Sequence, residues 1–484
     1  MRGVINRLLL IGMCALACVS CKEYQVSEDP TLRLTFSADT LCFDTILTGQ
    51  GSATLLLTIY NPNSKALLID HIWMEENRYF RINIDGEQQI ENLTNLPVYG
   101  GDSLFVFVRV TDFGEVDGNI PVIIEDLLHF HLSSGVKQSV VMQAYGQNVI
   151  RLGKAGNGRQ DYASYHFTAE RPYLLFDTIV VHGNLTIDAG STLYMHNGAC
   201  LYAGGDVNAE GTINQPILIR GDRLDNLFDS VPYLYAGGSW NGIYLQSDKP
   251  QNYNFSYVDI LSGNIGLYCY CASEEKPLST LRMDGCRIHN HTLYGLVLVH
   301  TDAVVTNTEI SNCASYCVYC SGGTHDFIHS TIASYFGATN IRIQTTSKTE
   351  SAAVFIDNLQ KTGAQTISSF YNSIITGYLT NQLVVATPFD YYYPGRFVGN
   401  YLKTDSLSFP HAESNVYWHA EDTMAVFRNS YYKYKEYVYY NFRLDTLSPA
   451  RNIGDSLLAL PYPTDRDGHS RAHCKPDAGC YQSE

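Results

Sequence analysis

The chain has 484 residues, of which 45% are hydrophobic and 17% charged, a composition typical of a folded protein and not of a disordered one. This length exceeds one ordinary hydrophobic core and predicts two or three folded units. The formal net charge of −16 argues against nucleic acid or an anionic membrane surface as a partner.

Residues 1–20 predict a lipoprotein signal peptide. Arg2 and Arg7 precede an apolar run, Leu8–Val19, that is too short to span a bilayer. Ser20-Cys21 resembles a bacterial lipobox, with Cys18 where leucine is usual, and this resemblance implies lipid attachment at Cys21. Ordinary signal-peptidase cleavage nearby is the alternative. Residues 21–30 would then be a tether, and multiple acyl chains would anchor the protein firmly.

The basic-then-acidic pair Lys22-Glu23 resembles the signal that sends Bacteroidetes lipoproteins to the outer face of the outer membrane. We therefore expect an outer-membrane, lipid-anchored and surface-exposed protein. Asp, then Ser or Thr, then an aliphatic or methyl-bearing residue resembles the O-glycosylation motif of exported Bacteroidetes proteins. Asp-Ser and Asp-Thr also favour turns, but turn chemistry does not explain the apolar third residue. The nine candidate acceptors are Thr40, Thr45, Ser103, Thr178, Ser230, Ser406, Thr423, Thr446 and Ser456.

Residues 31–148 show short alternating strands at intervals of about ten residues, which predict an antiparallel β-sandwich. The strand Thr54–Tyr60, the turn at Asn61 and the return strand Leu67–Ile69 resemble the immunoglobulin-like domains of ciliary and periplasmic proteins. That resemblance implies a spacer or adhesion module. Residues 149–172 are rich in glycine and polar residues and predict a linker.

A repeat of about twenty residues predicts a parallel β-helix over residues 173–400. Ile288, Ile310 and Ile332 recur every 22 residues, each within a short apolar-alternating run. Two further apolar columns recur with a similar spacing, so every inward side chain would fill one slice of a continuous core. Their predicted members are Leu267, Leu296, Val318 and Ile341 in one column, and Cys269, Leu298, Cys320 and Ile343 in the next.

The segments Pro216–Ile219 and Trp240–Ile243 resemble the first rungs of right-handed parallel β-helix proteins, the fold of pectate-lyase-like enzymes and many adhesins. Leu447–Gly454, Asp465–Arg471 and Pro476–Tyr481 resemble the closing signature of such proteins. We therefore expect residues 401–484 to form terminal rungs and a C-terminal cap. The predicted fold class is all-β, with an antiparallel sandwich followed by a capped parallel solenoid.

Catalytic residues are harder to predict. The loop carrying Asp222, Asp225 and Asp229 is the strongest acidic group and could serve calcium or a sugar hydroxyl network, as the resemblance to lyases and hydrolases implies. A solvated loop is the alternative, because outward aspartates do not recur on successive rungs. Calcium is expected only if the protein is a lyase, and no other cofactor is expected.

Two further groups suggest ligands. His291 and Cys313 lie 22 residues apart, so they would stack on neighbouring rungs and could hold a soft metal. Turn packing is the favoured alternative, since no third ligand follows at that register. Asn290 and Asn312 share a column in which stacked amides would be structural. Cys474 and Cys480 are close enough in sequence to form a disulfide, although none is required.

Tyrosine clusters offer a binding surface. Aromatic faces with hydroxyl tips suit sugar stacking, and the candidates are Tyr391, Tyr392, Tyr431 and Tyr432. The alternative is that these rings cover the flank of the solenoid. Taken together, the sequence favours non-catalytic binding or scaffolding toward glycans or envelope proteins. The alternative function is a polysaccharide lyase or glycoside hydrolase of the β-helix fold.

Overall fold

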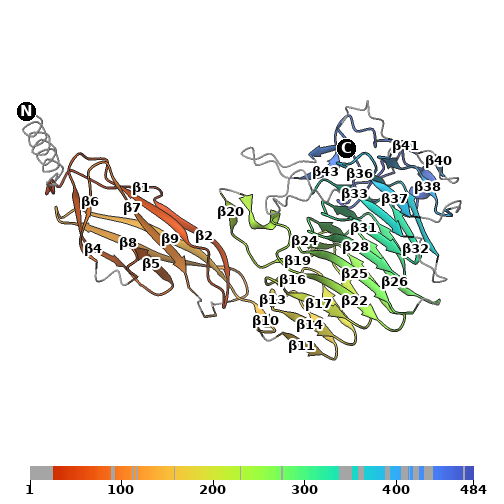
Figure 1. Ribbon diagram of the computed structural model, residues 1–484, viewed down its shortest axis with the longest axis horizontal. Coiled ribbons are helices and arrows are strands. Elements are labelled where there is room, and N and C mark those ends of the chain that lie inside the picture. Colours follow the sequence, from red (N-terminus) through yellow and green to blue (C-terminus); the bar gives the residue numbers. More distant parts are fainter. Residues whose placement is uncertain are drawn as a thin grey trace, which may run out of the picture. The chain divides into compact units, whose positions relative to one another are not determined.

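A computed structural model gives the fold as two compact units, with the boundary between Asn148 and Val149 (Figure 1). Strands dominate both units, as the alternating sequence pattern predicts. No helix among the described residues is long and apolar enough to cross a membrane. The structure describes residues 25–88, 93–111, 114–115, 118–156, 158–228, 231–273, 276–336, 352–357, 365–386, 393–404, 412–413, 415–417, 425–429, 440–472 and 475–483.

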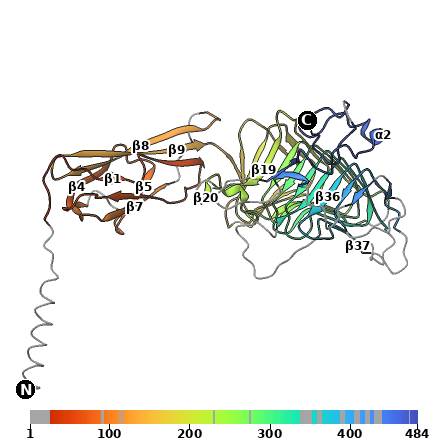
Figure 2. The same cartoon turned by 90° about the horizontal axis from the view of Figure 1, so that it is seen from above.

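The N-terminal unit is a β-sandwich, and Figure 2 shows β8 and β9 in one layer and β5 and β7 in the other. One sheet has the order β1-β3-β7-β5 and the other the order β2-β9-β8-β4-β6. All pairs are antiparallel except β2 with β9. The strands are β1 (Thr35–Phe36), β2 (Thr40–Leu47), β3 (Leu55–Tyr60), β4 (Leu67–Met74), β5 (Phe80–Ile84), β6 (Thr94–Val98), β7 (Ser103–Val110), β8 (Val122–Leu132) and β9 (Lys137–Gln147).

Alternation along each strand buries one face of each sheet against the other. In β7, for example, Leu104, Val106, Val108 and Val110 are buried, whereas the side chains between them point to solvent. The predicted antiparallel sandwich is therefore present.

The second unit is a solenoid in which successive coils add strands to three parallel sheets, as the stacked arrows of Figure 1 show. The first sheet contains β10 (Ile150–Leu152), β13 (Tyr173–Leu175), β16 (Thr192–Met195), β19 (Ile217–Gly221), β24 (Val258–Leu261), β27 (Arg287–His289), β30 (Glu309–Ser311), β33 (Thr331–Ser334), β36 (Ile374–Gly377), β39 (Tyr401–Leu402) and β41 (Val416–Tyr417). The second sheet contains β11 (Arg159–Tyr162), β14 (Thr178–Val181), β17 (Cys200–Ala203), β22 (Gly242–Ser247), β25 (Ile265–Cys271), β28 (Tyr294–Val299), β31 (Val318–Ser321), β34 (Val354–Asp357) and β37 (Leu383–Ala386). The third sheet contains β12 (Tyr165–Phe167), β15 (Leu185–Asp188), β18 (Val207–Glu210), β23 (Asn252–Ser256), β26 (Ser279–Asp284), β29 (Thr301–Thr306), β32 (Gly323–Ile328), β35 (Thr366–Tyr371), β38 (Phe397–Val398) and β40 (Ala412–Glu413).

The predicted isoleucine column is confirmed. Ile288 pairs with Ile310, which pairs with Ile332, and all three are fully buried. Because parallel pairing places like positions one above another, each isoleucine fills one slice of the same elongated core. The parallel β-helix predicted from the period is therefore present.

The last predicted member of each of the other two apolar columns was wrong. Val354 follows Val318, and Ile356 follows Cys320, in the places expected for Ile341 and Ile343. Ile341 and Ile343 lie outside the described residues. The chain between β33 and β34 is longer than the corresponding connections in the coils directly before it. A constant period of 22 residues therefore predicts column positions that precede β34 in the sequence.

The segment 149–172, expected to be a linker, instead begins the solenoid. It carries β10, β11 and β12, which pair with β13, β14 and β15 respectively. Leu152 and Phe167 are buried within the solenoid core. The glycines that suggested a linker occupy turns, where Gly153, for instance, has a φ of +76°.

Asparagines at the turn after the first sheet form the predicted ladder. The side-chain amide of Asn312 donates to that of Asn290 at 3.2 Å, and Asn290 donates to the Ser262 hydroxyl at 3.1 Å. All three residues have positive φ, between 57° and 66°, a conformation that asparagine tolerates well. The ladder therefore gives the amide N–H groups of Asn290 and Asn312 acceptors at turns that the repeat requires.

Within residues 401–484, β39, β40 and β41 form the expected terminal rungs of two parallel sheets. The C-terminal segment that follows lies against the outward face of the first sheet, where we expected a cap over the last rung. It includes the hairpin β42 (Phe427–Asn429) and β43 (Asn441–Leu444) and the short helix α2 (Ser456–Ala459). Its apolar side chains, including Phe442 and Tyr481, bury Ala333 and Ile374 of that sheet. Arg466 reaches Asp259 of β24 at 2.6 Å. The segment therefore holds several coils together from the side.

Candidate ligand-binding surface

An outward-facing column of aromatic side chains runs along the second sheet. In register, Tyr202 lies beside Tyr244, which lies beside Tyr268, and Tyr319 lies beside Phe355 farther along. Val297 occupies the position between these two groups. With two flanking rings, the aromatic stripe consists of Tyr202, Tyr244, Tyr268, Tyr294, Tyr316, Tyr319 and Phe355.

Several neighbouring rings of the aromatic stripe stack on one another, and others meet at a tilt. The ring centroids of Tyr202 and Tyr244 are 4.6 Å apart with planes at 12°, and those of Tyr319 and Phe355 are 5.8 Å apart with planes at 6°. Tyr316 also stacks on Phe355 at 4.9 Å. Parallel coils hold equivalent side chains one strand spacing apart, which brings these rings into contact. All of them are half-buried, so one face or edge stays available to a ligand.

Two hydroxyl groups of the aromatic stripe, those of Tyr244 and Tyr319, remain protonated at neutral pH. Partial burial raises the pKa of Tyr244 and of Tyr319 to about 12, so neither phenol ionises under ordinary conditions. The Tyr319 hydroxyl donates to an Asp357 carboxylate oxygen at 3.1 Å. The stripe therefore offers apolar ring surface together with neutral hydroxyl groups.

A depression of about 420 Å³ lies at the Tyr202 end of the aromatic stripe. Polar side chains of Arg159, Thr178, His182 and Gln246 line it beside the Tyr202 ring. Next to it, Asp161 accepts hydrogen bonds from Arg159 at 2.6 Å and from His182 at 2.7 Å. The hydrogen bond from Arg159 has the larger effect on Asp161, and the bond from His182 adds to it. Together they lower the pKa of Asp161 to about 2, so the carboxylate is ionised.

The acidic loop predicted as a catalytic alternative is engaged in local ion pairs. An Asp222 carboxylate oxygen lies 2.6 Å from His196 Nδ1, and this hydrogen bond raises the pKa of His196. Asp225 accepts from Arg223 Nε at 2.6 Å, and the Arg223 guanidinium lies over the Tyr233 ring. Each carboxylate thus has its own basic partner. Asp229 lies outside the described residues.

The loop continues into a short excursion between β19 and β22. It contains the hairpin β20 (Asn226–Phe228) and β21 (Val231–Pro232) and the 3-10 turn η2 (Tyr233–Tyr235). Tyr233 N donates to Asp225 O at 2.9 Å, so backbone bonds as well as ion pairs hold the loop. Its acidic residues therefore have a structural role in the described part of the loop.

His291 and Cys313 lie in the solenoid core. His291 Nδ1 accepts from Gly263 N at 3.2 Å, and Nε2 donates to Ile260 O at 3.1 Å. Burial lowers the pKa of His291 to about 3 and raises that of the Cys313 thiol. Both imidazole nitrogens are thus already used by backbone groups, which favours turn packing over metal binding.

Several other cysteines are also buried in the described part of the chain. Cys269, Cys286 and Cys320 are fully buried within the core, as expected for small apolar side chains. Cys480 is a buried thiol in the C-terminal segment, and Cys474 lies outside the described residues. Cys21, the candidate for lipid attachment, also lies outside them.

The candidate O-glycosylation acceptors differ in exposure. The exposed ones are Thr40, Thr446 and Ser456, and the half-buried ones are Thr45, Ser103 and Thr178. Ser230, Ser406 and Thr423 lie outside the described residues. In one triplet the aspartate has a clear structural role: Asp455 caps α2 and accepts from Leu457 N and Leu458 N.

The structure does not describe the tyrosines predicted to bind sugars, namely Tyr391, Tyr392, Tyr431 and Tyr432. The aromatic stripe was missed, although a signal for it was present. Tyr268 and Tyr319 stand between the inward residues of the predicted columns, and a residue between two inward positions points outward. Reading the intervening positions would have found both rings.

Neither a protein-family model nor a curated protein matches this chain. Solved structures give only distant similarities. The Vibrio cholerae VesB protease aligns with 24% of this chain and 32% of its own, at 14% identity and a TM-score of 0.18. A PapD-like domain of human CEP192 aligns with 27% of this chain and 92% of its own, at 11% identity and a TM-score of 0.17. Dex49A from Penicillium minioluteum aligns with 73% of this chain and 77% of its own, at 8% identity and a TM-score of 0.15. At these TM-scores the similarities carry no functional conclusion.

Proposed function

We propose that this protein is a lipid-anchored protein of the cell envelope that binds an extended, neutral glycan along its β-helix without cleaving it. The aromatic stripe is the observation that carries the proposal. It presents half-exposed rings on consecutive coils, and a depression with hydrogen-bonding side chains lies at one end. Sugar rings stack on aromatic faces, and their hydroxyl groups bond to polar tips.

Charge favours a neutral polymer over an acidic one. The chain carries a formal net charge of −16, which would repel a polyuronate approaching from solution. The hydroxyl groups of Tyr244 and Tyr319 are neutral, so binding through them does not require a charged sugar. An extended polymer also matches a site in which equivalent rings repeat along a solenoid.

The proposed location depends on the N-terminal sequence. The charged and apolar residues before the lipobox-like Cys21 support lipid anchoring in the outer membrane, and Lys22-Glu23 supports exposure at the cell surface. Exposed acceptors at Thr40, Thr446 and Ser456 support O-glycosylation of a Bacteroidetes-type surface lipoprotein. The N-terminal β-sandwich would act as an immunoglobulin-like spacer between the anchor and the β-helix.

Affinity electrophoresis against a panel of neutral polysaccharides tests the proposal. The double variant Tyr244→Ala with Tyr319→Ala removes one ring from each of the two groups that flank Val297 in the stripe. If each ring contributes about 0.5–1.5 kcal/mol, losing two rings weakens the affinity by about 5-fold to 150-fold. Tyr371→Ala is the matched control, because Tyr371 is an equally half-buried tyrosine on the third sheet. Equal affinity of the double variant and the control would show that the stripe only stabilises the fold.

The same panel, extended to uronic-acid polymers with calcium, tests the catalytic alternative. Unsaturated products or new reducing ends that disappear in Asp222→Ala and Asp225→Ala would replace the binding proposal with a lyase or hydrolase. Binding without product release supports the proposal.

A further inference from the structure

A β-bulge in the larger sheet of the N-terminal sandwich brings three metal-ligand side chains together. Ile69 lies opposite Leu132, but His71 lies opposite His131, so β4 has one extra residue at this point. The extra residue is Asp70. A bulge re-aims neighbouring side chains, and here neither Asp70 nor His71 is buried, which breaks the burial alternation of the strand.

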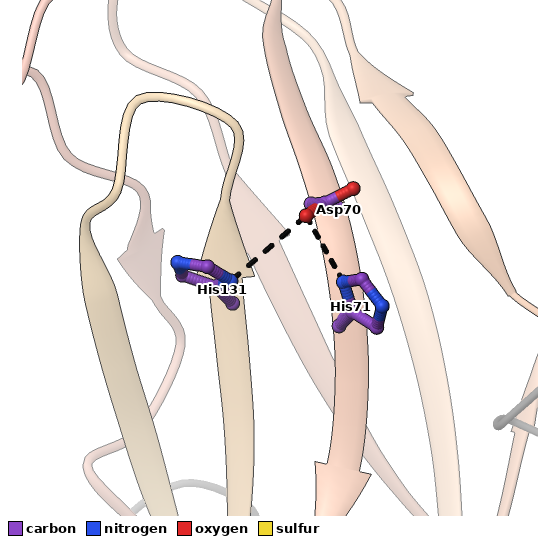
Figure 3. A group of neighbouring side chains, drawn as sticks. All are labelled: Asp70, His71 and His131. Atoms are coloured by element: carbon purple, nitrogen blue, oxygen red, sulfur yellow. Dashed lines mark ion pairs between the residues drawn. The ribbon is translucent and has the colours of Figure 1, made fainter.

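The three side chains converge on the outer face of the sheet, where β4 and β8 pair (Figure 3). Asp70 Oδ2 lies 3.0 Å from His71 Nδ1 and 4.0 Å from His131 Nδ1. All three donor atoms lie within 4.8 Å of one another. Zinc binds histidine nitrogen and carboxylate oxygen at about 2.0–2.2 Å, so ligand atoms around one ion are separated by roughly 3–3.5 Å. Small side-chain rotations would reach that geometry.

We propose that Asp70, His71 and His131 bind a single Zn²⁺ ion. Two imidazoles and one carboxylate suit borderline divalent transition metals and select against Mg²⁺ and Ca²⁺, which prefer oxygen ligands. The side chains of His71, Asp70 and His131 are 61%, 35% and 31% exposed, so the ion can enter from solvent and keep water in its remaining positions. Because the ligands come from two paired strands, the ion clips β4 to β8. This site is independent of the proposed glycan-binding surface.

Titration calorimetry of the purified protein with ZnCl₂ tests the site. A Cys42→Ser background removes the exposed thiol on β2, which could bind zinc by itself. We expect one saturable equivalent of Zn²⁺, no comparable binding of Mg²⁺ or Ca²⁺, and at least tenfold weaker zinc binding in His71→Gln and in His131→Gln. Zinc should also raise the thermal midpoint of the parent protein but not that of either variant.

His129→Gln is the matched control. His129 lies on β8 two residues from His131, stacks on Trp73, and has Glu75 as its carboxylate neighbour at 3.8 Å. Zinc affinity should be unchanged in this variant. The proposal is overturned if the parent protein shows no saturable binding, or if the His71→Gln and His131→Gln variants, folded by circular dichroism, bind zinc as the parent does.

Discussion

His291 shows how complete burial fixes the charge state of a side chain in this solenoid. Burial lowers its pKa to about 3, and it lowers the pKa of His289 and His325 to about 4. His325 likewise uses both ring nitrogens, toward Ser368 Oγ at 2.8 Å and Thr301 O at 3.0 Å. A histidine that bonds in this way must remain neutral, because a protonated ring would be an uncompensated buried charge.

These histidines predict a loss of stability in mild acid. In the unfolded chain a histidine has a pKa near 6.5, so between about pH 6.5 and pH 4 the unfolded state binds more protons than the folded state. Stability therefore falls as the pH falls through this window. Each buried histidine should contribute about 1.4 kcal/mol of loss between pH 7.5 and pH 5.5. Denaturant titrations at these two pH values measure the loss.

The variant His291→Asn separates this effect from that of carboxylates. It should be less stable than the parent at pH 7.5, because a cavity forms and hydrogen bonds are lost. It should lose about 1.4 kcal/mol less than the parent on going to pH 5.5. An identical pH dependence in parent and variant would contradict the assignment of His291 as a buried neutral histidine.

At the scale of elements, the C-terminal segment is joined to the first sheet by buried polar contacts as well as by apolar ones. The Tyr481 hydroxyl donates to Glu309 Oε2 at 2.5 Å, and the Ser311 hydroxyl donates to Glu309 Oε1 at 2.7 Å. Asp259 accepts from Arg466 at 2.6 Å and from Arg287 at 2.9 Å. Each of these two carboxylates thus has one partner in the C-terminal segment and one in the first sheet.

Tyr481→Phe tests this attachment with a change of one hydroxyl group. The variant leaves an oxygen of buried Glu309 without its donor, and a hydrogen bond to a charged group contributes about 1.5–3 kcal/mol. We expect a loss of about 2 kcal/mol in the free energy of unfolding, measured by denaturant titration. Tyr378→Phe is the control, because Tyr378 is 60% exposed and its replacement should be neutral. A neutral Tyr481→Phe would contradict the anchoring role.

At the scale of the whole molecule, the second unit has one elongated core shared by its coils. Buried side chains from Leu152 to Leu402 belong to a single apolar cluster, and the N-terminal sandwich has a separate core. Each coil therefore depends on its two neighbours for burial, as in other repeat proteins. A defect in a central coil should weaken the contacts on both of its sides.

Ile310→Ala tests this dependence. Ile310 is fully buried between Ile288 and Ile332, so its truncation should cost about 2–5 kcal/mol through lost burial and the remaining cavity. Ile213→Ala, at a position that is 44% exposed, should change stability by less than about 0.5 kcal/mol. Urea denaturation followed by far-ultraviolet circular dichroism compares the two. Equal effects would contradict the assignment of Ile310 to the shared core.

Features that repeat at constant spacing could be predicted from the amino-acid sequence. The Ile288, Ile310 and Ile332 column and the Asn290 and Asn312 ladder follow from coils of equal length, because parallel pairing converts a fixed period into vertical contact. The outward direction of Tyr268 is fixed in the same way, by the alternation of side chains along a strand.

Features that depend on unequal coil length or on distant contacts became known from the folded structure. Val354, and not Ile341, follows Val318 in its column, because the connection before β34 is longer than in the coils directly before it. No local sequence pattern shows where the chain re-enters the sheet after such a connection. Arg466 meets Asp259 across 207 residues, and His131 reaches Asp70 only because a bulge shifts the register of two paired strands. Such contacts depend on how separate segments fold against one another, since the side chains that meet carry no shared period along the chain.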